Sequence, residues 1–203
     1  MVTPCSGWQR WPPSFSRSPA SDHLIAAVAA FLGWLGASII VLADGRRGLA
    51  VGLAGAATGL AAIAWQDGDG VAALIVLGGG GAAALLRYRS GPGGWAVMPP
   101  GSTPRLILCV AGALVALWFA ASVTIGPGGA TRFVVLSVIG LSGARIVSSR
   151  EPSSVLTAVA TLALATAVAT DLGAGSAGPV PFITAVLIAA GALLLRVRVA
   201  NVP

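Results

Sequence analysis

Seven apolar runs follow one another along this chain of 203 residues, and they constrain its fold more than any other feature. A helix that spans a bilayer needs roughly 20 predominantly apolar residues. With 56% hydrophobic and only 9% charged residues, little of the chain is left for a soluble domain. The sequence therefore predicts an all-α, polytopic transmembrane helix bundle of about seven short helices. The runs are Leu24–Ala43, Gly48–Trp65, Val71–Leu86, Leu106–Ile125, Phe133–Val147, Val155–Thr170 and Val180–Leu195.

Glycine, proline and acidic residues separate these runs, which is typical of turns. Several runs are shorter than a full span, and we expect six or seven helices. The third and fifth runs are the least secure, because the cluster Gly78–Gly81 weakens the third and Arg145 shortens the fifth. We expect the glycine cluster to mark a flexible or closely packed point in a helix. We divide the chain into a polar Pro/Ser-rich leader (1–22), a seven-helix transmembrane domain (23–198) and a short tail (199–203).

The arginines predict the orientation, because short loops rich in arginine stay in the cytoplasm. An outside amino terminus and a cytoplasmic carboxyl terminus place nine of the twelve arginines on the cytoplasmic side. An even number of spans breaks the alternation between inside segments that carry arginines and outside segments that carry few. We therefore expect a multi-pass protein of the inner (plasma) membrane, in contact with membrane lipids. Basic charge this sparse, with a net charge of +6, indicates topology and no nucleic-acid partner.

The missing residue types exclude several classes of membrane protein. The chain has no lysine for a retinal Schiff base, and His23 is its single histidine, so paired haem ligands are excluded. No aspartate or glutamate lies well inside a run, although ion-coupled carriers normally keep such groups in the bilayer. Cys5 and Cys109 lie in different settings and do not form a metal site. We predict no enzymatic activity, no catalytic residue, no cofactor and no metal.

Glycines spaced by four residues give the clearest positive evidence in the sequence, and they indicate close helix packing. Gly48 with Gly52 and Gly55 with Gly59 leave one face of the second helix without bulk, so another helix can approach closely. The neighbouring helix belongs either to this chain or to a partner. These four glycines are our predicted helix-packing residues.

Few charged residues are candidates for a site. Arg145 has two interpretations: a buried cation that faces a partner subunit's carboxylate or a lipid phosphate, or a side chain that snorkels to the cytoplasmic surface. Asp67 and Asp171, which follow the second and sixth runs, either bind a cation at the outer face or simply end their helices. We name Arg145 as a possible partner or lipid contact.

The two halves of the chain share a weak pattern. The third run ends in Ala84-Leu-Leu-Arg-Tyr-Arg89, and the seventh ends in Ala192-Leu-Leu-Leu-Arg-Val-Arg198. A duplicated three-helix unit with one extra helix explains the pattern, and so does the general likeness of Ala/Leu/Val helices.

The segment from Gly36 to Ala50, in which a helix ends in the turn Asp44-Gly-Arg-Arg47, resembles the hydrogenase-4 component E family. This family is related to the small K-type membrane subunit of respiratory complex I. A similar arginine-bearing turn recurs at Ile146–Arg150. The resemblance implies a membrane subunit of a larger complex. Family members carry acidic residues after such turns for a lateral proton path, whereas the runs after Arg47 and Arg150 have none, so the resemblance implies a purely structural role.

Two functions of different classes follow. The first is a non-catalytic accessory subunit of a respiratory or hydrogenase-type membrane complex, which packs on other integral membrane subunits through glycine-lined helix faces. The second is a small independent transporter or channel for an uncharged or weakly polar solute. A third possibility is a membrane protein involved in assembly. The hydroxyl residues are scattered, and such groups often bond to their own helix, which favours the subunit.

Overall fold

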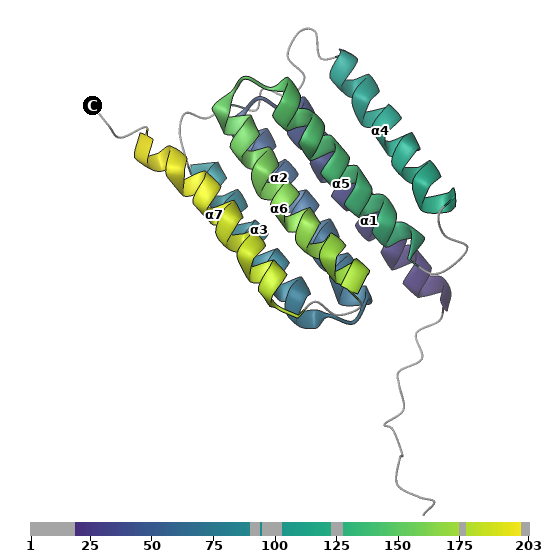
Figure 1. Cartoon of the computed structure of the whole chain (residues 1–203). Helices are drawn as coiled ribbons and strands as arrows, with labels where there is room; N and C mark the ends of the chain where they lie inside the picture. Colours follow the sequence, from purple (N-terminus) through teal and green to yellow (C-terminus); the bar gives the residue numbers. More distant parts are fainter. Residues whose placement is uncertain (1–18, 90–93, 95–102, 123–127, 175–177, 200–203) are drawn as a thin grey trace, which may run out of the picture.

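The structure is a computed structural model, and it describes residues 19–89, 94, 103–122, 128–174 and 178–199. Within these residues it contains seven α-helices and no strand, which confirms the predicted all-α bundle (Figure 1). The helices are α1 (Pro19–Leu42), α2 (Arg46–Gln66), α3 (Gly70–Arg89), α4 (Thr103–Ser122), α5 (Gly129–Ser148), α6 (Pro152–Ala174) and α7 (Val180–Val199).

Most helices extend beyond the apolar runs that predicted them, because polar residues continue the helix at the ends. Two of them begin at prolines, Pro19 and Pro152, where the missing N–H of proline is not needed by the helix. Helix α1 therefore includes the last four residues of the predicted leader. The rest of that leader, the end of the fourth run at Ile125 and the tail residues 200–203 lie outside the described residues.

The two least secure runs both form continuous helices, and the glycine cluster of the third includes a closely packed point, which is one of the two roles predicted for it. Helix α3 passes through Gly78–Gly81, where Gly79 and Gly80 pack closely on the rest of the bundle. A Cβ atom on Gly79 would lie 2.6 Å from Val186 Cγ1, and one on Gly80 would lie 3.3 Å from Leu164 Cδ1. Helix α5 likewise includes Arg145 in its last turn.

Six helices, α1 to α6, are long and apolar enough to cross a membrane. The described apolar part of α7, Val180–Ala192, is shorter. In lipid a helix satisfies all its backbone hydrogen bonds internally, which makes such helices stable there. The chain is a multi-pass membrane protein.

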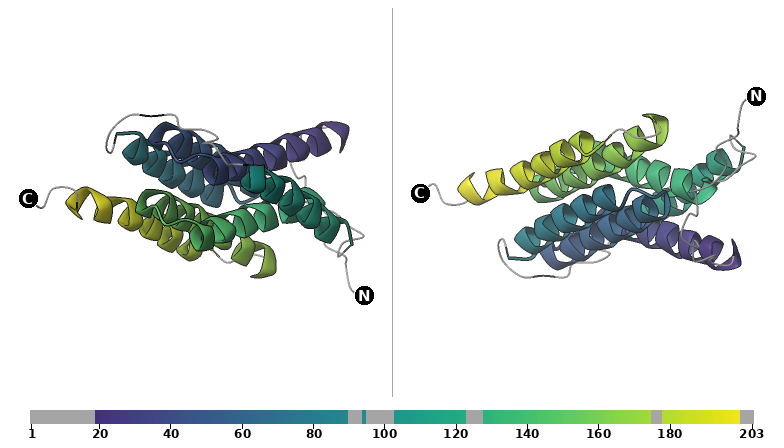
Figure 2. Two further views of the ribbon diagram at one scale, coloured as in Figure 1. Left: turned by 90° about the horizontal axis from the view of Figure 1, so that it is seen from above. Right: turned by 90° about the horizontal axis from the view of Figure 1, so that it is seen from below.

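The helices form two layers of three, with α4 at one side (Figures 1 and 2). In one layer α2 lies between α1 and α3, and in the other α6 lies between α5 and α7. The layers face each other in chain order, so that α1 packs on α5, α2 on α6 and α3 on α7. Among the helices that the structure describes, α4 contacts only α5 and α1. This arrangement is the one expected of a repeated three-helix unit with α4 between the repeats.

The two ends of the bundle differ in charge. One end holds the α1–α2 turn, the last turn of α3, the first turn of α4 and the α5–α6 turn; we call it the arginine end. Its arginines include Arg46, Arg47, Arg87, Arg89, Arg105, Arg145 and Arg150, and α7 also ends here with Arg196 and Arg198. The opposite, acidic end holds the α2–α3 turn, with Asp67 and Asp69, and the end of α6, with Asp171.

The backbones of α1 and α2 touch along the predicted glycine face. A Cβ atom on Gly52 would lie 2.9 Å from the Gly36 carbonyl oxygen, and one on Gly55 would lie 3.3 Å from Gly36 Cα. One on Gly59 would lie 2.7 Å from the Ala29 carbonyl oxygen. The neighbour of this face is therefore α1 of the same chain.

Alanine, valine and leucine fill the space between the two layers. Helix α2 is the most enclosed, with 67% of its apolar segment buried. Lipid tails are as apolar as these side chains, so close packing holds the layers together and the hydrophobic effect contributes little. The largest fully buried apolar side chains are Ile40, Leu49, Leu53, Leu60, Ile63, Leu164, Phe182, Val41, Val76, Val134 and Val138.

The close contact of α1 and α2 predicts a sharp difference between two identical substitutions. Gly36→Ala places a methyl group 2.7 Å from the Gly52 carbonyl oxygen, whereas Gly81→Ala places it in open space. Overpacking typically costs about 1–3 kcal/mol, so we expect a loss of that size for Gly36→Ala and none for Gly81→Ala. Unfolding of both variants in detergent micelles measures this, and equal stabilities would contradict the close approach.

Candidate functional site

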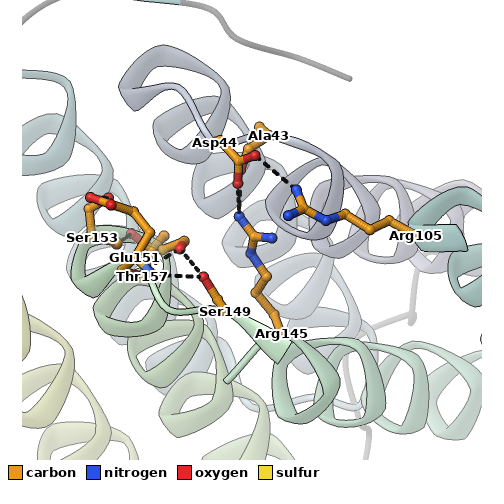
Figure 3. A network of polar contacts seen from close by, with 9 residues as sticks. Ala43, Asp44, Arg105, Arg145, Ser149, Glu151, Ser153 and Thr157 are labelled. Carbon is orange, nitrogen blue, oxygen red and sulfur yellow. Dashed lines mark hydrogen bonds and ion pairs between the residues drawn. The ribbon is translucent and has the colours of Figure 1, made fainter. Parts of the chain in front are cut away.

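Three charged side chains from different parts of the bundle converge at the arginine end (Figure 3). Asp44 lies in the α1–α2 turn, Arg105 in the first turn of α4 and Arg145 in the last turn of α5. Arg105 Nη1 donates a hydrogen bond of 2.8 Å to Asp44 Oδ2. Arg145 Nη2 donates to Asp44 Oδ1 and also, over 3.1 Å, to the Ala43 carbonyl oxygen. One carboxylate therefore joins both layers and α4.

Arg145 is almost fully enclosed, with 1% of its side chain exposed, whereas Asp44 and Arg105 keep 33% and 35%. Its partner is a carboxylate of the same chain. This burial differs from the predicted snorkelling side chain, and the contact of Arg145 with a partner subunit or lipid stays a prediction. A buried guanidinium needs a counter-charge, and the α1–α2 turn supplies it. Nε and Nη1 of Arg145 are buried and have no hydrogen-bond partner among the described residues.

The two arginines keep Asp44 ionised. Burial by itself would raise the pKa of this carboxyl group, but the hydrogen bonds and positive charges of Arg145 and Arg105 outweigh that effect and hold the pKa below its ordinary value. A lowered pKa means that the ion pairs stabilise the fold above the pKa of the unfolded chain. That contribution is lost as the pH falls through the pKa of the folded chain.

A chain of hydroxyl groups lies beside this cluster, at the start of α6 (Figure 3). The Ser149 and Ser154 hydroxyls are 2.6 Å apart, and Ser154 donates to the Glu151 carbonyl oxygen. Ser153 Oγ donates to Glu151 Oε1 over 3.1 Å, and Thr157 donates to the Ser153 carbonyl oxygen. The Glu151 N–H, just before the first turn of α6, donates to the Ser149 hydroxyl over 3.3 Å, so the same chain of hydroxyl groups also holds the backbone at the start of this helix.

A cavity of about 580 Å³ lies between the ion-pair cluster and the hydroxyl chain. We call it the rim pocket, and its walls carry both charged and hydroxyl side chains. Its lining residues are Asp44, Arg105, Ser148, Ser149, Arg150 and Glu151. An opening of this kind suits a polar, negatively charged group, since arginine guanidinium groups recognise phosphate and carboxylate well.

The acidic end brings together two candidates from the sequence, Asp67 and Asp171. Burial raises the pKa of Asp67, and the nearby charge of Asp171 raises it further, while a hydrogen bond from Thr131 opposes the shift. Asp69 has a different role, because its Oδ1 accepts a 2.9 Å hydrogen bond from the Ala72 N–H and so caps α3. In the described part of the chain, no three His, Cys, Asp or Glu side chains form a group that could hold a metal ion.

The predicted packing glycines lie away from these polar groups. Gly52, Gly55 and Gly59 contact α1, and Gly48 is buried at the start of α2. Sequence reasoning missed Asp44 and Arg105, because it treated one as a turn residue and the other as a topology signal. An arginine within an apolar run was a usable signal, since it requires a nearby anion.

The fold defines the class of this protein as a multi-pass helical membrane protein with a polar cluster at its arginine end. No protein-family model, no curated protein and no solved structure matches the chain. The resemblance to the hydrogenase-4 component E family therefore stays a prediction.

Substitution of Asp44 should destabilise the fold more than substitution of Arg145, although each removes the same buried ion pair. Asp44→Asn leaves the Arg145 charge buried, which costs up to about 3–5 kcal/mol in a fully buried pair; Asp44 is one-third exposed, so we expect about 2–3 kcal/mol. Arg145→Met should cost less, because Asp44 keeps Arg105 and water. Unfolding in detergent compares the two, with exposed Arg150→Gln as the control. A larger loss for Arg145→Met would contradict the assignment.

The raised pKa of Asp67 predicts a stabilising substitution. Above its pKa the folded chain carries a charge that burial and Asp171 disfavour, so Asp67→Asn should raise the melting temperature at pH 7. The gain should disappear as the pH falls and Asp67 in the unmodified chain becomes protonated. Asp69→Asn, which keeps an oxygen for the helix cap, should show no such pH-dependent gain. A gain for Asp67→Asn that is constant with pH would rule out this electrostatic cause.

Proposed function

We propose that this protein is a non-catalytic accessory subunit of a larger membrane complex, and that α4 is the helix that contacts its partner. The complex that we propose is of the respiratory or hydrogenase type, in the inner (plasma) membrane. The type of complex rests on the resemblance of the arginine-bearing turns alone. The support for a subunit role comes from the position of α4.

Helix α4 is far less enclosed than any other long helix of the bundle. Only 17% of its apolar segment is buried, against 39% or more in α1, α2, α3, α5 and α6. A narrow stripe of small residues, Cys109, Ala116 and Ala120, carries its contact with the bundle. This single observation carries the proposal, because α4 offers more free packing surface than the chain itself uses.

The outward face of α4 carries large side chains. Ile107, Leu114 and Trp118 lie opposite the small-residue stripe and are 60% to 65% exposed. Helices associate in lipid through van der Waals packing, which a ridge of large side chains next to smaller ones favours. The partner that fits is an apolar transmembrane helix of another integral membrane subunit.

The glycine face of α2 does not serve this purpose, although the sequence suggested that glycine-lined faces contact the partner. Helix α1 covers Gly52, Gly55 and Gly59 from within the chain. The proposed contact with a partner therefore moves to α4, and the glycines support the subunit from inside.

The paired three-helix layers favour a second candidate, a small transporter or channel for an uncharged or weakly polar solute, since repeated units form the paths of many carriers. Two buried hydroxyl groups of α6 support the first candidate instead. Thr157 and Thr161 donate to carbonyl oxygens of their own helix, one turn earlier. Hydroxyl groups used in this way offer little to a passing solute.

The subunit role predicts the behaviour of two matched substitutions. Leu114→Trp on α4 and Leu74→Trp on α3 alter side chains of nearly equal exposure, 62% and 64%. We expect Leu114→Trp to displace the chain from a large complex on native gels of mildly solubilised membranes, and Leu74→Trp to leave it there. Mass spectrometry of the band identifies the partner subunits.

The same gel distinguishes the two candidates. A band of monomer or small homo-oligomer size for the unmodified chain would contradict the subunit role. Uptake of an uncharged solute by liposomes that contain the purified chain alone would then support the transporter.

A further inference from the structure

A groove runs along one side of α4, between this helix and α5. Its volume is about 310 Å³ and its walls are almost entirely apolar. We call it the α4–α5 groove; its lining includes Leu108, Gly112 and Val115 of α4 and Ser137, Gly140 and Ala144 of α5. The two glycines create the hollow, since a Cβ atom on Gly140 would meet nothing within 4 Å and one on Gly112 only Leu141, at 3.5 Å.

The groove leads to the rim pocket. Arg105 precedes Leu108 by one helical turn on α4, and Ser148 follows Ala144 by one turn on α5, so the two helices carry the same faces from the groove into the pocket. The apolar α4–α5 groove thus continues into the polar rim pocket at the arginine end. This succession matches the order of an acyl chain and its headgroup in a phospholipid.

The charges at the opening favour an anion. Arg105 and Arg150 line the rim pocket and Arg145 lies directly behind Asp44, so three arginines face two carboxylates, Asp44 and Glu151. One positive charge is left over. The unpartnered Nε and Nη1 of Arg145 are buried, so this arginine contributes its charge to the rim pocket and no hydrogen bond.

We propose that the α4–α5 groove and the rim pocket together bind one anionic phospholipid. One acyl chain fills the groove, and the phosphate lies in the rim pocket near Arg105 and Arg150. Interfacial arginines attract anionic headgroups, and each buried methylene of the chain adds apolar contact. An apolar partner helix of the kind proposed for the outward face of α4 fits less well, because it brings no charge to neutralise the arginines.

This site lies on a different face of α4 from Ile107, Leu114 and Trp118, and the isolated chain is sufficient to test it. The full-length protein, stripped of lipid in detergent, is titrated with phosphatidylglycerol or with phosphatidylcholine of identical acyl chains. Native mass spectrometry counts the bound lipids. We expect one phosphatidylglycerol to bind at least fivefold more tightly than phosphatidylcholine, and we expect inorganic phosphate not to displace it.

Two substitutions test the two parts of the site, each with a matched control. Arg150→Gln should reduce the affinity for phosphatidylglycerol to that for phosphatidylcholine, while Arg89→Gln, an exposed arginine at the same end, should not. Gly140→Leu fills the groove and should weaken binding of both lipids. Gly143→Leu, on the same helix and also in open space, should leave binding unchanged.

Four results would overturn the proposal: equal affinity for the two lipids, equal effects of Arg150→Gln and Arg89→Gln, unchanged binding in Gly140→Leu, or displacement by inorganic phosphate, which would indicate a site for a free anion. A melting temperature for each variant confirms that it is folded. Because no partner is present, failure here would leave the proposed contact of α4 with another subunit untouched.

Discussion

The buried charge of Arg145 is the constraint on which the arrangement of the bundle depends. A guanidinium group in a low-dielectric interior is tolerated only beside a counter-charge with good hydrogen bonds. Asp44 supplies that charge from the α1–α2 turn, and the Ala43 carbonyl oxygen adds a second acceptor. The end of α5 is thereby fixed against the end of α1. Because Arg105 shares the same carboxylate, the start of α4 is fixed at this point as well.

Close packing of small residues fixes the helix contacts that the ion pairs do not reach. Helices in a membrane gain little from the hydrophobic effect when they associate, so close backbone approach must supply the contact energy. The α1–α2 pair achieves this through Gly36, Gly52 and Gly59, and α3 reaches the second layer through Gly79 and Gly80. The ion pair and the glycine contacts act in different directions, since one joins the ends of helices and the others bring their sides together.

Hydropathy predicted the helices well, because in a bilayer the length of an apolar run decides whether a helix can span it. The spacing of glycines also predicted a close helix contact on α2. It did not identify α1 as the neighbour, since Gly33 and Gly36 of α1 are three residues apart and lack the spacing of four. The partner of Arg145 was missed for a physical reason. Asp44 and Arg145 come together only when α1 and α5 pack side by side, and no local pattern records that pairing.

The position of α4 is the feature that sequence reasoning could not supply, and it decides what the molecule can do. The hydroxyls of Thr157 and Thr161 on α6 are bonded to their own helix, whereas those of Ser38, Ser137 and Ser142 are buried without a hydrogen-bond partner among the described residues. Helix α4, in contrast, has three separate faces: a small-residue stripe toward the bundle, a groove beside α5 and a ridge of large side chains. A helix built in this way, and held at one end by a shared carboxylate, is suited to join the bundle to its surroundings in the membrane.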